Sequence, residues 1–420
     1  MRPEEEATKV MVEGTSAWAA DAVEHRVAVV YNYFPHYRAG IVQELAQQSH
    51  NRYVFYSDQK DSHNEGILMY GFPTDIPHVA LRNSYIRGGW MWQHGVVKVA
   101  LSKECDTMLF LGDAHFLSTW VAAWCARYVR RKRVLFWTIG WHRQKSGLTS
   151  WARCRFYSIA HALLLYGQYG WQMAVNKGFS PGKCYVIGNS LDWRMQVKLR
   201  HTPSMADVKA TRLDLGVDPN LPMVICVSRL TPKRRLELLF EAASSLRSQG
   251  MPVSIVLVGE GRERDRLQRL ASELALDVVF VGAVYDEARL ASMVQAANAT
   301  VCPGMAGLTA IQSLTYGTPV ITHDDPEHQA PESEAVLTGV TGELFERDSV
   351  ASLATAIEHA CSRAVPDNAL RVQCYREVDE KFNPMYQRYV IDGAVSGWLP
   401  SEAIRAAAEA MHTCPVGGAR

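Results

Sequence analysis

Short apolar stretches alternate with helical stretches along this chain. Of all its sequence features, this pattern restricts the possible folds most. Residues 26–31, 108–111 and 134–137 are apolar runs, and each is followed by a loop that contains glycine. Short buried strands alternating with helices are typical of βαβ units, whose strands pair in parallel. We therefore predict an α/β protein with parallel sheets.

The same pattern restarts after a polar segment at residues 189–222. Strands are expected at 223–227, 253–258, 278–281, 300–302 and 319–322, with helices between them. A chain of 420 residues accommodates two such units. We expect two Rossmann-like domains that face each other across a cleft, with ligands at the C-terminal ends of the strands.

Composition excludes several classes of protein. Hydrophobic residues make up 48% and charged residues 21%, which disfavours a disordered or fibrous chain. No apolar run approaches the roughly 18 residues that span a membrane. The acidic start (Glu4, Glu5, Glu6) lacks a secretory pattern. The nine cysteines are scattered without a C-x-x-C pair, which indicates reduced thiols in a cytoplasmic protein rather than disulfides or a zinc site.

Charge is distributed unevenly along the chain. Residues 1–200 carry 24 Lys and Arg against 15 Asp and Glu, which gives +9, and the remainder carries 20 against 28, which gives −8. A basic half favours an anionic partner, such as a phosphate-bearing ligand or a membrane surface, or it is an uneven surface without functional meaning. Nucleic acid is disfavoured because the excess is diffuse and no recognition motif accompanies it.

Two cations follow the first strand of the second unit. Arg229 and Lys233 are four residues apart around a turn, in the stretch 227–234. Fixed cations at the end of a strand suit a diphosphate, which Arg binds with two parallel hydrogen bonds. The alternative is a solvated start of a helix.

A loop of small residues leads into a helix at residues 303–314. The backbone N–H groups of Leu308 and Thr309, together with the helix dipole, form an anion site. Gln312 lies one turn further on and either binds a ribose or sugar hydroxyl or is a surface side chain. The glycines at 259 and 261 lack the full G-x-G-x-x-G pattern, so a nicotinamide cofactor is not expected.

Together these stretches resemble the nucleotide-sugar domain of GT-B glycosyltransferases, and most closely the retaining glycosyltransferase family four. They occur in the family's order at roughly its spacing, and the resemblance covers residues 183–360 well and the N-terminal half more loosely. The matching stretches are 227–233, 258–261, 280–284, 303–320 and 340–342. Residues 136–141, 166–167, 189–192 and 309–323 are similar to a bacterial branch that builds surface polysaccharides.

The resemblance implies a GT-B fold and sugar transfer from a nucleotide-sugar donor to a glycan, lipid-linked or small-molecule acceptor, with retention. It implies no metal and no cofactor beyond the donor itself. The implied domains are a flexible tail (1–25), an acceptor domain (26–195), a donor domain (205–382), and a C-terminal helix returning to the first domain plus a tail (383–420).

The resemblance also implies roles for individual residues. Arg229 and Lys233 would stabilise the departing diphosphate, and the backbone at Ala283 and Val284 would meet the base. The remaining implied donor-binding residues are Gly40, Ser228, Gly259, Gly307, Leu308, Thr309 and Gln312.

One departure from the family concerns a pair of glutamates eight residues apart. Gly304 replaces the first, which normally touches the sugar, and Gln312 replaces the second, which normally touches the ribose. Glu332 and Glu334 either supply a carboxylate instead or are acidic loop residues in water. Two alternatives to a transferase therefore stay open: a GT-B-shaped protein that binds nucleotide or glycan without transfer, and a nucleotide-sugar epimerase.

Candidates in the first domain lie in loops after strands. Arg38 is a candidate for binding an anion or the acceptor, and Gly40 permits close approach. His115 and His142 each either face the cleft or are structural. We favour His142 as the catalytic one because it adjoins Gly140 and Trp141.

Aromatic and basic residues are interleaved at 85–92, and a basic run follows at 130–133. Such residues suit the interface of an anionic membrane, whereas Trp90 and Trp92 are alternatively core residues. The expected location is cytoplasmic, with possible peripheral contact with the inner face of the membrane.

Overall fold

A computed structural model describes residues 23–59, 68–86, 88–141, 143, 147–201 and 203–413. These residues form two compact units. The first unit runs to Asp192 and resumes at Asn383, and the second is Trp193–Phe382. The divisions fall beside the expected limits of 195 and 382. Most of the expected N-terminal tail lies outside the described residues, and the first strand begins at Arg26.

The first unit is built on a seven-stranded sheet in the order β3-β2-β1-β6-β7-β8-β9. All of its strand pairs are parallel, and β1 lies between β2 and β6, with Val29 opposite Phe55 and Leu109. The strands are β1 (Arg26–Val30), β2 (Arg52–Ser57), β3 (His78–Ala80), β6 (Thr107–Leu111), β7 (Arg133–Thr138), β8 (Ala162–Leu165) and β9 (Cys184–Val186).

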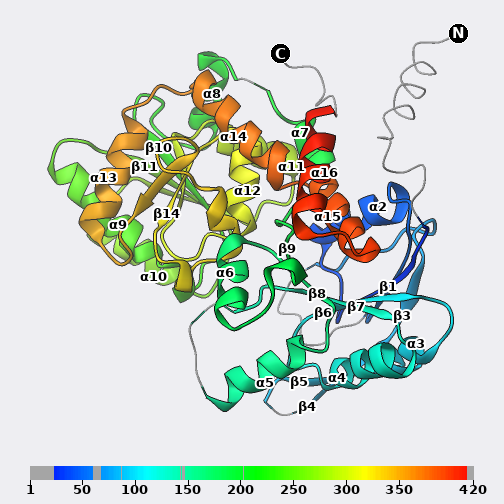
Figure 1. Cartoon of the computed structure of the whole chain (residues 1–420). Helices are drawn as coiled ribbons and strands as arrows, with labels where there is room; N and C mark the ends of the chain where they lie inside the picture. Colours follow the sequence, from blue (N-terminus) through cyan, green and yellow to red (C-terminus); the bar gives the residue numbers. More distant parts are fainter. Residues whose placement is uncertain are drawn as a thin grey trace, which may run out of the picture. The chain divides into compact units, whose positions relative to one another are not determined.

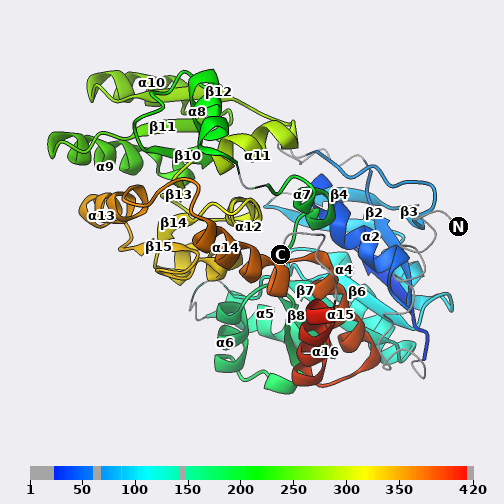
Figure 2. The ribbon, with the colours of Figure 1, turned by 90° about the horizontal axis from the view of Figure 1, so that it is seen from above.

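Helices cover both faces of this sheet (Figure 1). On one face α3, α4, α5 and α6 bury small and aromatic residues such as Ala122 and Phe156. On the other, α15 packs against both α2 and α16 (Figure 2). The helices are α2 (Ala39–Gln47), α3 (Val96–Leu101), α4 (Leu117–Trp124), α5 (Leu148–Tyr157), α6 (Gln168–Asn176), α15 (Pro384–Ser396) and α16 (Pro400–Thr413), with helical turns η1 (His36–Arg38), η2 (Cys125–Val129) and η3 (Pro181–Lys183).

The segment at 85–92 belongs to an antiparallel hairpin, β4 (Arg82–Ile86) and β5 (Trp90–His94). Trp90 is 41% exposed, whereas its neighbour Met91 is fully buried. Trp90 is therefore not a core residue.

The basic run at 130–133 was considered for a membrane interface, but its four side chains are not all exposed. The Lys132 ammonium is buried and donates to the Val99 carbonyl at 3.2 Å and to Cys105 Sγ at 3.1 Å. Arg133 Nε donates to the Ala394 carbonyl at 2.7 Å. Two of the four cations therefore tie the first unit together internally.

The second unit is built on a six-stranded, wholly parallel sheet in the order β12-β11-β10-β13-β14-β15. Its four inner strands, β11, β10, β13 and β14, are largely apolar and buried, as parallel strands between helices are, whereas the edge strands β12 and β15 are partly exposed. They are β10 (Met223–Val227), β11 (Ser254–Val258), β12 (Val278–Gly282), β13 (Ala299–Cys302), β14 (Val320–His323) and β15 (Gly342–Phe345).

Helices α9, α10 and α13 cover one face of the second sheet, and α8, α11 and the end of α12 cover the other (Figure 1). The helices are α7 (Trp193–Val197), α8 (Met205–Asp214), α9 (Leu236–Ser248), α10 (Arg264–Glu273), α11 (Glu287–Gln295), α12 (Leu308–Thr315), α13 (Val350–Cys361) and α14 (Asn368–Lys381), with turns η4 (Pro232–Arg234), η5 (Pro326–His328) and η6 (Pro331–Ala335).

Both sheets reverse their strand order beside their first strand, between β1 and β6 and between β10 and β13. The prediction of an α/β fold with parallel sheets is confirmed. Ligands of such sheets bind beyond the carboxyl ends of the strands where the order reverses. None of the helices in the described part of the chain is long and apolar enough to cross a membrane.

Candidate functional site

Two loops meet at the reversal point of the second sheet, one after β10 and one after β13. The first carries Arg229 and Lys233, and the second runs from Pro303 to Gly307 into α12. The side chain of Thr309 joins the two, because its Oγ1 donates to the Val227 carbonyl at 3.0 Å. The stretches singled out in the sequence are thus brought together by the fold.

Two glycines let the loop after β11 pack closely on the loop after β10. A Cβ on Gly259 would lie 1.9 Å from the Ser228 carbonyl oxygen, and one on Gly261 would lie 2.2 Å from that of Leu230. Gly259 also has φ +141°, which side chains rarely adopt. These glycines therefore serve backbone packing around the candidate site.

Gly304 has the same role on the other side of the loop. Its Cβ would lie 2.3 Å from the Lys233 carbonyl oxygen, and its N–H donates to the Arg234 carbonyl at 3.1 Å. Arg234 Nη1 in turn donates to the Met305 carbonyl at 2.6 Å. A Cβ at position 304 would therefore clash with the backbone in this packing.

Gln329 anchors the loop between β13 and α12 through three hydrogen bonds. This buried amide accepts a hydrogen bond from the Ala306 N–H at 2.8 Å and donates to Thr322 Oγ1 at 2.7 Å and to the His323 carbonyl at 2.9 Å. The loop between β13 and α12 is therefore anchored to the end of β14.

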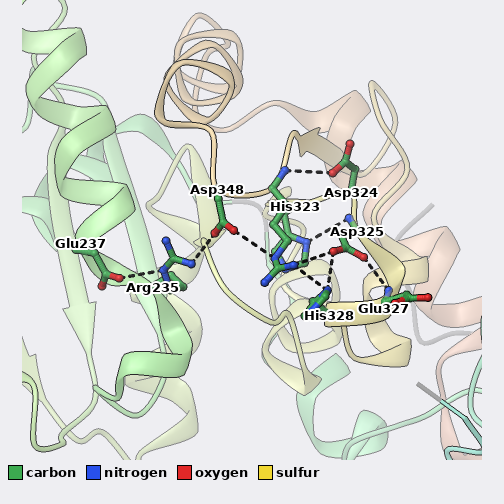
Figure 3. Close-up of polar contacts among 9 residues, drawn as sticks. Arg235, Glu237, His323, Asp324, Asp325, Glu327, His328 and Asp348 are labelled. Atoms are coloured by element: carbon green, nitrogen blue, oxygen red, sulfur yellow. Dashed lines mark hydrogen bonds and ion pairs between the residues drawn. The ribbon is translucent and has the colours of Figure 1, made fainter. Parts of the chain in front are cut away.

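Arg229 and Lys233 are both exposed at the carboxyl end of β10. The next turn is braced by Arg235, which has φ +51° and lies between two carboxylates (Figure 3). Arg235 donates to Glu237 Oε1 at 3.0 Å and to Asp348 Oδ1 at 2.5 Å. The turn that presents Lys233 is thereby tied to the segment after β15.

A second set of polar contacts surrounds the end of β14 (Figure 3). Asp325 Oδ2 lies 2.6 Å from His328 Nδ1 and accepts from Arg347 Nη1 at 3.0 Å. The Asp325 N–H donates to Nδ1 of buried His323 at 3.3 Å. Burial, reinforced by the charge of Arg347, lowers the pKa of His323, so this imidazole is neutral near pH 7.

Helix α12 begins at Leu308 beside this loop. The first N–H groups of a helix have no acceptor within it, so those of Leu308 and Thr309 suit an anion. Gln312 is half-buried, and its Nε2 donates to Glu287 Oε1 at 2.8 Å. Gln312 is therefore not a solvated surface side chain.

Glu287 was missed by the sequence analysis. It lies in the first turn of α11, and its Oε1 also accepts from Tyr316 Oη at 2.6 Å and from Gln196 Nε2 at 2.9 Å. Nothing in the sequence links Glu287 to Gln312, which lies 25 residues further on. Ala283 and Val284 lie just before α11, and Ala283 is exposed.

The cysteines near this site are not nucleophiles. Burial raises the pKa of Cys226, at the end of β10, and raises that of Cys302, at the end of β13, to about 12. Both thiols therefore stay protonated at neutral pH. Cys226 Sγ lies 3.6 Å from Oγ of Ser228, whose own side chain is half-buried.

The two loop glutamates differ in environment. Glu332 is 5% exposed within η6, which packs on α12, and Glu334 is half-buried. The alternative that both are acidic loop residues in water therefore does not hold for Glu332.

In the first unit, the candidates lie near the ends of β1 and β6. Arg38 is buried, donates to Asn189 Oδ1 at 2.9 Å and to Tyr166 Oη, and stacks over the Trp137 ring at 5.1 Å. A Cβ on Gly40 would lie 2.6 Å from the Leu191 carbonyl oxygen, so its close approach is to the chain's own backbone.

His115 is exposed and its Nδ1 lies 2.8 Å from Asp113 Oδ1. His142 lies outside the described residues. No cluster of His, Cys, Asp or Glu suited to a metal ion occurs among the residues the structure describes. A surface pocket of about 300 Å³, lined by Met205, Arg212 and Asn298 among others, lies at the opposite, amino edge of the second sheet.

Comparison with known proteins finds a family model that matches most of the second unit. Residues 207–376 match the model of the family "Glycosyl transferases group 1". A D-inositol 3-phosphate glycosyltransferase from Gordonia bronchialis is 33% identical over 177 residues, which are 39% of this chain and 37% of that protein. A GDP-mannose-dependent monoacylated alpha-(1-6)-phosphatidylinositol monomannoside mannosyltransferase from Corynebacterium glutamicum is 27% identical over 36% of this chain and 45% of that protein. The matches span less than half the length of these relatives.

Solved structures share the fold of both units. HepE of Anabaena in complex with UDP has a TM-score of 0.66 at 18% identity and covers 89% of this chain and 99% of its own. The lipopolysaccharide outer core galactosyltransferase WaaB has a TM-score of 0.64 at 14% identity and covers 86% and 97%. The expectation of a GT-B fold is thus confirmed.

Proposed function

Because residues 207–376 match the model of the group 1 glycosyl transferases, we propose that this protein transfers a sugar from a nucleotide-sugar donor to an acceptor, with retention. The observation that carries the proposal is the meeting of the cationic loop after β10 and the start of α12 at the reversal point of the second sheet. The structure of HepE contains UDP, which supports a nucleoside diphosphate as the ligand.

In this proposal the second unit binds the donor. Arg229 and Lys233 neutralise the charge that develops on the departing diphosphate, and the N–H groups of Leu308 and Thr309 hold its oxygens. Gln312 binds the ribose, and the backbone of Ala283 and Val284 meets the base. No protein nucleophile and no metal are required.

The first unit, in this proposal, binds the acceptor near Arg38 and the loops of His115 and His142. The relatives named for phosphatidylinositol mannosides and lipopolysaccharide favour a lipid-linked or surface-glycan acceptor. We place the reaction on the cytoplasmic side, with the protein in peripheral contact with the membrane.

Thermal unfolding with UDP, GDP, ADP, CMP and their common sugar conjugates tests the donor site. A ligand at about 100 times its dissociation constant adds roughly 2.7 kcal/mol of stability. We expect one nucleotide to stabilise the wild type and not Arg229→Ala. If no nucleotide stabilises the wild type, the donor site is refuted.

Gly304 favours one second candidate, a protein that binds nucleotide without transferring sugar, because the glutamate that normally touches the sugar is absent. Measuring donor consumption with and without glycan acceptors separates the possibilities. Consumption that needs an acceptor supports transfer, consumption without one supports an epimerase, and binding without consumption supports the second candidate.

A further inference from the structure

An exposed apolar surface covers two helices of the first unit. We call it the aromatic face, and it comprises Val121, Trp124, Tyr128 and Val129 of α4 and η2 with Leu148 and Trp151 of α5. These side chains are between 42% and 85% exposed. Each helix also turns small or apolar residues such as Ala122 and Phe156 inward, so each carries apolar side chains both toward the core and toward solvent.

The two helices that carry these side chains pack against each other. The rings of Trp120 on α4 and Phe156 on α5 pack with centroids 4.9 Å apart. Arg127 Nη1 donates to the carbonyls of Ser158 and Ala160, just after α5, at 2.9 Å each. Figure 1 shows α4 and α5 along the same lower edge of the unit. Ring packing between Trp120 and Phe156 and the hydrogen bonds of the Arg127 guanidinium therefore hold the two helices together.

Charge on this part of the chain has one sign. Residues 114–191 contain eleven Lys and Arg and no Asp or Glu, and the rest of residues 1–200 contains 13 Lys and Arg against 15 acids. The whole basic excess of that half thus comes from this stretch. Two of its cations stack on rings of the aromatic face, Arg127 over Tyr128 at 5.3 Å and Arg155 over Trp151 at 5.5 Å. Arg131 is exposed two residues after Val129.

We propose that the aromatic face docks the protein on an anionic membrane surface. Tryptophan, tyrosine and leucine side chains partition into the headgroup region, while arginines beside them attract anionic lipids. A second copy of the chain is disfavoured as the occupant, because two such faces would bring like charges together. Nucleic acid is disfavoured because the aliphatic side chains of Val121, Val129 and Leu148 have neither charge nor hydrogen-bond donors for a phosphate backbone.

The docking surface deepens the proposed function and rests on it for the lipid-linked acceptor, whereas vesicle binding itself requires no donor. The proposed membrane contact also differs from the one expected from the sequence, which was at residues 85–92 and 130–133. The basic run is partly turned inward at Lys132 and Arg133, and the exposed aromatics gather on α4, η2 and α5 instead.

Vesicle sedimentation of the full chain tests the proposal, with vesicles of phosphatidylcholine alone and of phosphatidylcholine with phosphatidylglycerol. We expect binding only to the anionic vesicles, and we expect it to weaken with added salt. The variants Trp124→Ser/Trp151→Ser and Arg131→Glu/Arg155→Glu should each bind roughly tenfold more weakly or worse.

Matched controls lie in the second unit. Leu213→Ser/Val372→Ser removes apolar side chains that are similarly exposed, and Arg269→Glu/Arg376→Glu reverses two exposed cations. Both controls should bind like the wild type. Thermal unfolding confirms that each variant is folded, and stabilisation by UDP reports the donor site separately.

Binding that is absent, that is equal on neutral vesicles, or that survives in both aromatic-face variants would overturn the proposal. So would a dimer in sedimentation velocity that Trp124→Ser/Trp151→Ser dissociates, because the face would then be a protein interface. If vesicle binding behaves as expected while no nucleotide stabilises the wild type, the donor site fails and the docking surface stands.

Discussion

The side-chain amide of Gln312 donates to Glu287 Oε1 at 2.8 Å, so a carboxylate from α11 orients the residue that we propose binds the ribose. With its nitrogen held by Glu287, Gln312 keeps its carbonyl oxygen for the ribose of the proposed donor site. The pair therefore offers a hydroxyl the same kind of acceptor that a glutamate would.

Gln312→Glu should lower both stability and nucleotide affinity, because it brings two carboxylates within hydrogen-bonding distance. The expected loss in the free energy of unfolding at pH 7 is about 1–3 kcal/mol. The loss should shrink as pH falls toward 5, because the pair then binds a proton in the folded state. Denaturant unfolding and nucleotide titration measure both effects.

The swapped double variant Glu287→Gln/Gln312→Glu is the control. It restores one carboxylate and one amide, so it should recover most of the lost stability and affinity. A double variant as poor as Gln312→Glu alone would contradict the pairing.

Gly304→Ala should destabilise the second unit, because its Cβ would lie 2.3 Å from the Lys233 carbonyl oxygen. We expect a loss of about 1–3 kcal/mol in denaturant unfolding. Gly307→Ala is the matched comparison, since a Cβ there meets nothing within 4 Å, and it should lose only about 0.5 kcal/mol as a helix N-cap. Equal losses in the two variants would refute the close approach.

The alternation of strands and helices was readable because buried parallel strands such as β10 and β11 are uninterrupted apolar runs. The strand β2 and the hairpin of β4 and β5 were not predicted, since their aromatic and polar residues mix without a clear period. The sequence marked Gly304 as a departure, but the close approach of the Lys233 backbone to Gly304 is visible only in the fold. Likewise, no local sequence pattern predicts that Lys132 is buried or that Glu287 and Gln312 form a hydrogen bond.

Stability should fall as pH drops from about 7 toward 5, partly through His323. Burial, together with Arg347, lowers the pKa of His323 in the folded state, whereas the unfolded imidazole titrates near 6.5. Below that pH the unfolded chain binds a proton that the folded chain does not, so acid favours unfolding. His323→Gln keeps an acceptor for the Asp325 N–H and should flatten this pH dependence in unfolding experiments. An unchanged slope would show that His323 does not contribute.

Arg229→Ala and Lys233→Ala should each lower turnover more than about tenfold, because fixed cations at the departing diphosphate act most strongly in the transition state. Both side chains are exposed, so neither variant should unfold the protein. Arg269→Ala, which removes an exposed cation from α10, should leave turnover unchanged. Steady-state kinetics with the donor found in the thermal experiments makes the comparison. Wild-type turnover in both Arg229→Ala and Lys233→Ala would mean that the loop after β10 does not hold the diphosphate.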